Sequence, residues 1–102
     1  MNNQQEQTLR PLRQLLVRDG YEWEGTDACL LLARHFAEDG EGPSVRISVA
    51  VNSIVDLPVF EVGVVFAWDE EEQLLAKVEG LEQAVGACRA GEALIEARAK
   101  SL

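Results

Sequence analysis

The chain has 102 residues, of which 47% are apolar and 26% are charged, and its formal net charge is −9. This composition matches one ordinary globular domain and excludes a fibrous or disordered protein, while the negative charge opposes direct binding to nucleic acid or an anionic membrane. We expect a single domain over residues 1–102. A cytoplasmic location is predicted, because residues 1–5 lack the features of a secretion signal and no apolar run of about 18 residues is present.

The first predicted element is a helix over residues 9–19. Residues 1–7 are polar and lack periodicity, so we expect them to fray. Thr8 is suited to cap the helix, Pro11 falls in the first turn, where its missing N–H costs nothing, and Gly20 ends the helix. One stripe of leucines predicts the buried side, and it consists of Leu9, Leu12, Leu15 and Leu16.

Residues 27–38 are compatible with either a helix or a strand. Their alanine and leucine content, with Thr26 as a cap, favours a helix. Their short length and the turn residues at 38–43 favour one strand of a hairpin. We prefer the strand, because the turn leads directly into an alternating segment.

The next two predicted strands show clear alternation. Residues 45–52 have valine or isoleucine at every second position, and residues 59–68 alternate in the same way, with Trp68 last in the apolar series. Together with residues 27–38, these segments predict a three-stranded antiparallel meander with one apolar inner face. The outer face is also moderately apolar.

A long helix is predicted over residues 70–99. Asp69 is suited to cap it, three glutamates follow where the helix dipole favours negative charge, and Glu72 occupies the capping-box position. The apolar residues form a heptad-like series, interrupted by Glu92: Leu74, Val78, Leu81, Val85, Cys88 and Ile95. The predicted fold class is therefore α+β, with an N-terminal helix, a three-stranded antiparallel meander and a long C-terminal helix packed on one sheet face.

The length of the last helix predicts a homodimer. Such a helix would span about 45 Å, whereas a strand of ten residues spans about 33 Å, so its last turns would overhang the sheet. Either the helix breaks at Gly86 or Gly91, or the overhang packs on a second molecule. The residues expected in that interface are Val85, Cys88, Gly91 and Ile95.

No residue pattern predicts catalysis, a cofactor or a metal site. His35 is the only histidine, and Cys29 precedes it by six residues, which span about 20 Å along a strand and exclude a thiol–imidazole pair. The acids at 69–72 would suit a hard cation, but a helix start explains them. Cys29 and Cys88 are expected to be reduced and buried.

Acidic and aromatic side chains in the middle of the chain are the predicted binding groups. Thirteen of the eighteen acidic residues lie between positions 19 and 72, against two arginines. Trp23 stands between Glu22 and Glu24 and is a candidate partner-facing aromatic. The candidate binding residues are Trp23, Glu22, Glu24, Glu38, Asp39 and Glu41.

These observations predict a small acidic protein-binding module, acting as an adaptor, inhibitor or chaperone-like protein on a partner with a basic surface. The alternative is an acidic decoy that mimics nucleic acid and inhibits a DNA- or RNA-binding protein, as phage-encoded inhibitors of bacterial defence do. Carboxylates in a double row at phosphate-like intervals would favour the decoy. An apolar patch rimmed by acids would favour the protein-binding module. An enzyme would require His35 and carboxylates from separate elements in one cleft.

The predicted order of helix, three strands and long helix resembles that of the small acidic dimeric chaperones of bacterial secretion systems. The resemblance lies in architecture alone and includes no motif. It implies a client-binding function and assigns no residue.

Overall fold

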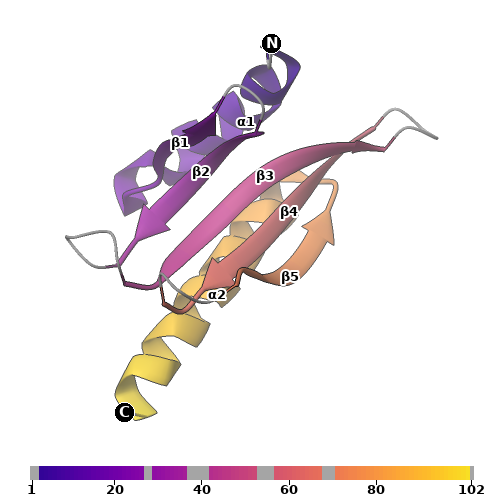
Figure 1. The fold of residues 1–102 in the computed structure, drawn as a ribbon. Coiled ribbons are helices and arrows are strands. Elements are labelled where there is room, and N and C mark those ends of the chain that lie inside the picture. Colours follow the sequence, from indigo (N-terminus) through magenta and orange to yellow (C-terminus); the bar gives the residue numbers. More distant parts are fainter. Residues whose placement is uncertain (1–2, 27–28, 37–41, 53–56, 68–70, 102) are drawn as a thin grey trace.

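The computed structural model describes residues 3–26, 29–36, 42–52, 57–67 and 71–101. Within them, five strands form one antiparallel sheet between an N-terminal and a C-terminal helix (Figure 1). Each strand pairs with its neighbours in sequence, so the sheet is a meander of order β1-β2-β3-β4-β5. The elements are α1 (Asn3–Leu16), the 3-10 helix η1 (Val17–Asp19), β1 (Glu22–Thr26), β2 (Cys29–His35), β3 (Ser44–Asn52), β4 (Leu57–Val65), β5 (Gln73–Val78) and α2 (Leu81–Ser101).

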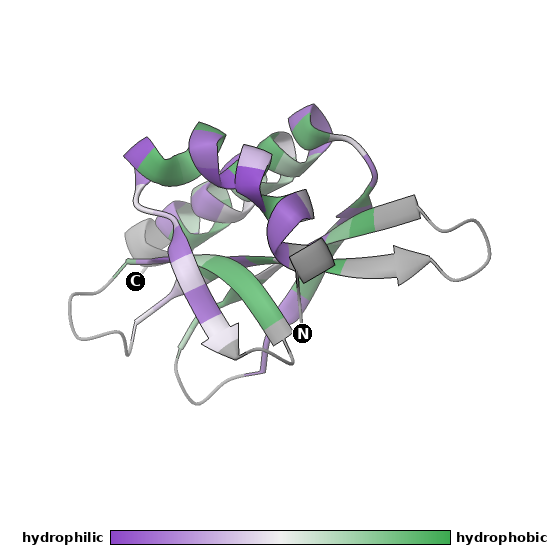
Figure 2. Ribbon diagram, turned by 90° about the horizontal axis from the view of Figure 1, so that it is seen from above, coloured by the Kyte–Doolittle hydropathy of each residue, from purple (hydrophilic) through white to green (hydrophobic). Residues whose placement is uncertain are grey.

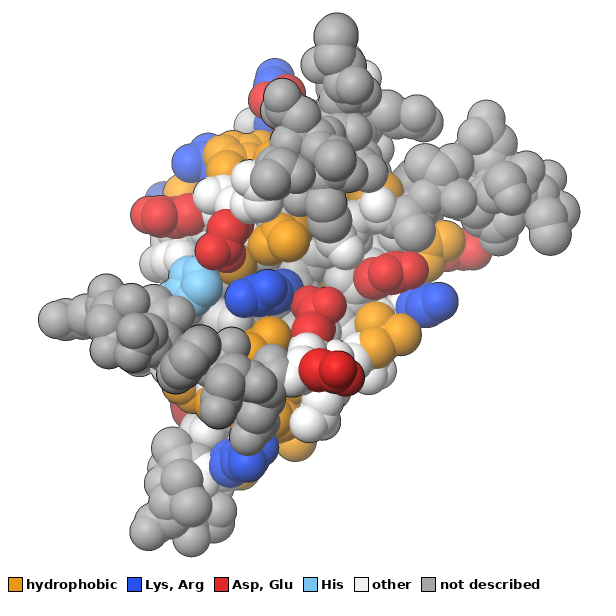
Figure 3. All heavy atoms as spheres, viewed as in Figure 1, with side chains coloured by type: hydrophobic (Ala, Val, Ile, Leu, Met, Phe, Trp, Pro, Cys, Tyr) orange, Lys and Arg blue, Asp and Glu red, His pale blue; other side chains and the backbone are white. Residues whose placement is uncertain are grey.

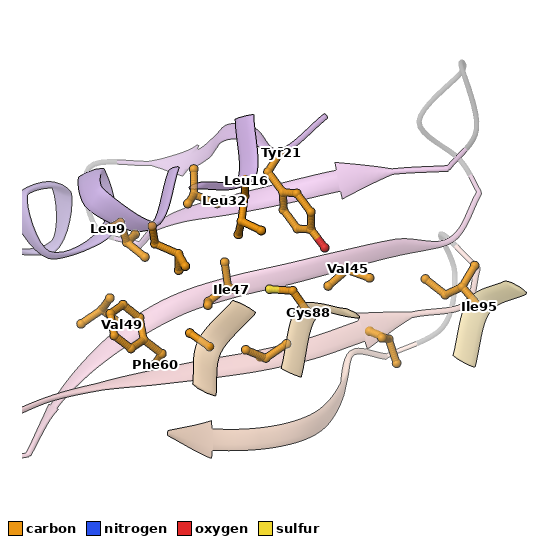
Figure 4. Close-up of a cluster of buried hydrophobic side chains, with 14 residues drawn as sticks. Leu9, Leu16, Tyr21, Leu32, Val45, Ile47, Val49, Phe60, Cys88 and Ile95 are labelled. Carbon is orange, nitrogen blue, oxygen red and sulfur yellow. The ribbon is translucent and has the colours of Figure 1, made fainter. Parts of the chain in front are cut away.

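Both helices lie on the same face of the sheet, and the hydrophobic core fills the space between them and the strands (Figures 2 and 4). Every second side chain of β3 and β4 faces this core, and cross-strand partners such as Ile47 and Val62 are both fully buried. The helices contribute Leu9, Leu12 and Leu16 from α1 and Ala84, Cys88 and Ile95 from α2.

No helix among the described residues has the length and apolar character needed to cross a membrane.

Helix α1 begins earlier than the sequence predicts. It starts at Asn3, so Thr8 lies inside the helix and Pro11 lies beyond its first turn. Because Pro11 is exposed, the carbonyl that loses its helical hydrogen bond can be solvated. The α-helix ends at Leu16, three residues before the predicted end, and η1 continues to Asp19. Gly20 then ends the helical segment as predicted, in a left-handed conformation with φ of 89°. In the leucine stripe only Leu15 is wrong, because 55% of its surface is exposed.

The α+β class fits, but the predicted three-stranded meander is wrong, because the sheet has five strands. The strand interpretation of residues 27–38 is confirmed as β2, and the two alternating segments form β3 and β4. Strand β4 ends at Val65, before the predicted end at Trp68, which lies outside the described residues. The two edge strands, β1 and β5, are absent from the predicted fold. Strand β1 has only five residues, too few for its alternation to stand out.

The predicted helix over residues 70–99 is also wrong, because its first part is a strand. Strand β5 occupies this part and pairs with β4, and Glu72 precedes the strand instead of capping a helix. The apolar series is misleading, because the register shift in β5 puts Leu74 and Val78 on opposite faces of the sheet. Leu74 pairs with Gly63 and is 55% exposed, whereas Val78 packs against the core. Asp69, the predicted cap, lies outside the described residues.

Helix α2 has 21 residues and continues without a break through Gly86 and Gly91. It spans about 32 Å, close to the length of the strands against which it packs. The predicted helix length is therefore wrong, although the C-terminal turns of α2 still extend beyond the ends of the strands (Figure 1). The homodimer stays a prediction. The first turn is fixed by the Gly80 N–H, which donates to Gln83 Oε1 over 3.3 Å, and by the Ala84 N–H, which donates to the Gly80 carbonyl over 2.9 Å.

Gly91 lies where α2 approaches the sheet closely. A Cβ atom at this position would lie 3.1 Å from Val64 Cγ1, 3.2 Å from Leu75 Cδ1 and 3.3 Å from Val45 Cγ2, all tighter than ordinary van der Waals contact. Gly86, on the same helix, is exposed and has no atom within 4 Å of the equivalent position. Only the glycine at position 91 is therefore required by packing.

Alanine substitutions should separate these two glycines. Gly86→Ala should raise the free energy of unfolding by up to about 1 kcal/mol, because alanine is the better helix former. Gly91→Ala has the same helical gain but should lose about 1–3 kcal/mol through crowding against the sheet. Urea denaturation of both variants measures the difference, and equal gains would show that α2 does not need this close approach.

Candidate functional site

One face of the sheet carries no helix among the described residues, and this face, which we call the open face, is the main candidate surface. It lies opposite the core-facing residues such as Leu32 and Ile47, and cross-strand partners share it. Figure 3 looks onto this face and shows acidic, basic and apolar side chains intermixed. The strand pairing assigns two rows to it: Glu22, Ala33, Arg46, Gly63 and Leu74, and then Glu24, Leu31, Ser48, Glu61 and Lys77.

Glutamates outnumber cations among the described residues of the open face. Its cations are Arg46 and Lys77, and Lys77 Nζ lies 3.8 Å from Glu61 Oε1. Glu72 reaches this face from the segment before β5, since a Cβ atom at Gly63 would lie 2.8 Å from Glu72 Cγ. The surface is therefore mixed, with an acidic excess. Its glutamates are Glu22, Glu24, Glu61 and Glu72.

An open hollow of about 300 Å³ lies at the β1 side of the open face. His35 Nε2 lies 3.0 Å from Glu24 Oε2. The register pairs Glu24 with Leu31, and His35 lies four residues after Leu31 on β2. The side chains of Glu24 and His35 therefore extend toward each other along the strands. The hollow is lined by Gly20, Glu22, Trp23, Glu24, Ala33 and His35.

The hollow meets one requirement of an enzyme, since it gathers His35 with carboxylates from a separate strand. However, the side chains of His35 and Glu24 are 31% and 43% exposed, and the lining residues include no serine, cysteine or lysine nucleophile. Electrostatic catalysis is strongest where water is excluded. The hollow therefore presents a partly exposed carboxylate paired with an imidazole.

The structure brings only two of the predicted binding residues, Glu22 and Glu24, together on the open face. Trp23 pairs with Leu32, packs against the core and has the Arg13 guanidinium carbon 5.9 Å from its ring centroid, so it belongs to the helix-covered face. Its contact with a partner stays a prediction. The three remaining candidates lie outside the described residues, and they are Glu38, Asp39 and Glu41.

The residues predicted to form a dimer interface lie against the chain's own sheet. Cys88 and Gly91 are buried, and only 4% of the surface of Ile95 is exposed. Val85 is partly buried and packs against the same core. One chain therefore already covers most of this apolar surface, and the role of these residues between copies stays a prediction.

A second group of polar residues, which we call the Glu92 network, connects α2 to η1, to β2 and to Tyr21. The Tyr21 hydroxyl donates to Glu92 Oε2 over 2.6 Å, and Arg89 Nη1 donates to the same oxygen over 3.1 Å. Glu92 Oε1 lies 3.4 Å from Arg34 Nη1, and Arg89 Nη2 donates to Asp19 Oδ2 over 2.6 Å. Glu92 is only 9% exposed, and these partners offset the cost of burying its charge.

Local sequence patterns could not predict the Glu92 network, because Tyr21 and Glu92 are 71 positions apart. The available signal is Glu92 itself, a carboxylate that interrupts the apolar series of the last helix. A charged residue at a buried position implies partners from elsewhere in the chain. Their identity depends on the packing of α2 against the sheet.

Burial keeps two acidic groups beside this network protonated. It raises the pKa of Tyr21 far above that of a free tyrosine, with smaller contributions from Cys88 and Glu92. It also raises the pKa of Cys88 to about 12, so this thiol is neutral at physiological pH and a poor nucleophile. The hydrogen bond to Asp19 raises the pKa of Arg89. The Glu92 network therefore holds the fold together and offers no reactive group.

Comparisons with protein-family models, curated proteins and solved structures found no match for this chain. The resemblance to secretion chaperones is based on three strands and a long helix, and the five-stranded sheet corrects that layout. In the part of the chain with described side chains, no three histidine, cysteine or carboxylate groups gather where they could hold a metal ion.

Removing the central carboxylate of the Glu92 network should destabilise the fold. Glu92→Leu removes the acceptor of the Tyr21 hydroxyl and the carboxylate partner of Arg34, and it leaves Arg89 with Asp19. We expect a loss of about 2–4 kcal/mol in the free energy of unfolding. Glu96→Leu is the matched control, because Glu96 is exposed on the same helix, and it should change stability by less than about 0.5 kcal/mol. Equal effects in urea denaturation would show that the buried carboxylate contributes nothing.

The raised pKa values predict a loss of stability in alkaline solution. The ordinary pKa values of Cys88 and Tyr21 are 9.0 and 10.0, but both groups keep their protons to higher pH in the folded chain. The folded state then binds more protons, so this stabilisation is complete below pH 9 and declines as the pH rises toward the folded values. We expect the free energy of unfolding to fall by about 3 kcal/mol between pH 8 and pH 10.5. A Tyr21→Phe/Cys88→Ala variant should lose much less, and an equal decline would contradict this assignment.

Proposed function

We propose that this protein is a non-catalytic binding module that holds a basic segment of another protein against the open face. The observation that supports it most is the sheet face without a helix, on which partly buried apolar residues such as Leu31 and Val59 lie among glutamates. Such a surface can contact apolar and basic side chains of one partner together. It suits an adaptor, an inhibitor or a chaperone-like protein.

The charge of the chain supports a basic partner. A net charge of −9 attracts cations from a distance and accelerates association at low ionic strength. On the open face, the excess of glutamates continues this attraction at short range. One chain is enough to form the face, so the proposed binding requires no dimer.

A nucleic-acid mimic is less well supported by this surface. A decoy needs carboxylates in regular rows, because it must replace the phosphates that a basic groove binds. Both described rows contain a cation, Arg46 in one and Lys77 in the other. A basic groove would meet like charge at these positions.

Charge reversal on the open face should weaken the binding of a basic peptide. We expect Glu22→Lys/Glu72→Lys to lower the affinity for a short fluorescent peptide of arginine and leucine by at least about tenfold at low salt, because each reversal replaces attraction with repulsion. Fluorescence anisotropy measures the affinity.

The matched control is Glu82→Lys/Glu96→Lys, which changes the net charge equally on the exposed surface of α2. It should weaken binding by less than about threefold, because these positions act only through the overall field. Equal losses in the two double variants would show that total charge alone attracts the peptide, and would contradict a site on the open face.

A further inference from the structure

We infer that the edge strand β1 accepts an extended basic segment of the partner as a sixth strand of the sheet, with a basic side chain entering the hollow beside Glu24. The incoming strand is the basic segment of the proposed function, on which this inference rests. Three features support it: the free edge of β1, the spacing of its glutamates and the position of the hollow.

Strand β1 is at one end of the sheet, and no described strand pairs with its outer side. The backbone N–H and C=O groups of such an edge can pair with another chain. Glu22 and Glu24 would place like charges opposite each other if two copies of β1 paired, and this disfavours self-association. An incoming strand with basic residues at these positions is favoured by the same rule. The edge therefore discriminates between a basic partner and a second copy.

The other edge of the sheet has a weaker preference, because it combines Glu72, just before β5, with a cation. Strand β5 has Lys77 on the open face, and its pairing with β4 is irregular between Val62 and Gly63. A positive side chain at an edge opposes a basic strand. The proposed segment should therefore pair with β1 in preference to β5.

The spacing of Glu22 and Glu24 predicts the pattern of the segment. Residues two apart on a strand lie about 6.6 Å apart on the same face, so basic residues at every second position would lie opposite both glutamates. The residue between them would point to the helix-covered side, beside Trp23. An apolar residue could pack there, whereas a basic one would approach Arg13, whose guanidinium lies over Trp23. The expected pattern is basic–apolar–basic.

The hollow provides space for one of these basic side chains. Among the described residues, the partner of Glu24 there is the His35 imidazole, at 3.0 Å. A guanidinium group can bind a carboxylate through two parallel hydrogen bonds, which an imidazole cannot do. An arginine entering the hollow would therefore displace His35 from Glu24 and lie over Ala33.

Two peptides with the same alternating arginine and valine sequence test the inference. In one, every backbone nitrogen is methylated, which keeps the charges and removes the N–H donors that a sixth strand needs. We expect the unmethylated peptide to bind at least about tenfold more tightly. Amide hydrogen exchange on the full chain should slow in β1 when this peptide binds, while exchange in β5 stays unchanged.

The outcomes separate this inference from the proposed function. If both peptides bind equally and Glu22→Lys/Glu72→Lys weakens both, the sixth strand is overturned and the open-face function stands. If binding of the unmethylated peptide is insensitive to that double variant, or if that peptide does not bind at low salt, the sixth strand and the proposed function are both overturned. Slower exchange in β5 instead of β1 also overturns the assignment to β1.

Discussion

The packing of β3 and β4 against the two helices is the interaction on which the other features depend. Alternate residues of these strands face α1 and α2 and are fully buried, as Val45 and Val64 are. The intervening residues must then lie on the opposite face, where no helix covers them. The same alternation that forms the core therefore also places Arg46, Ser48 and Glu61 on the candidate binding surface.

The Glu92 network determines where the edge strand lies relative to this core. Tyr21 immediately precedes β1, and its hydroxyl meets a carboxylate of α2. A buried carboxylate restricts the positions of its donors, because an unpaired donor or acceptor in the interior is costly. The start of β1 is thus tied to the opposite layer of the molecule. Glu22 and Glu24 are held in place by a contact in which neither takes part.

Alternation predicts β2, β3 and β4 because one-sided burial produces a strong period of two. It fails at both edges of the sheet. Strand β1 has a single core-facing aromatic, Trp23, and an irregular pairing with β4 breaks the alternation of β5. The part of the candidate site that comes from neighbouring residues in the sequence, Glu22 and Glu24, is predictable. The approach of His35 to Glu24 depends on strand register, which no local pattern encodes.

The meander order has a consequence for the synthesis of this chain. Because each strand pairs with the next one in sequence, hairpins can form as soon as adjacent segments are available. Helix α2 is the exception, since Cys88 and Ile95 complete the core from the last element. The apolar side of β3 and β4 therefore remains half covered until that helix leaves the ribosome. That interval is when the nascent polypeptide is most exposed to aggregation.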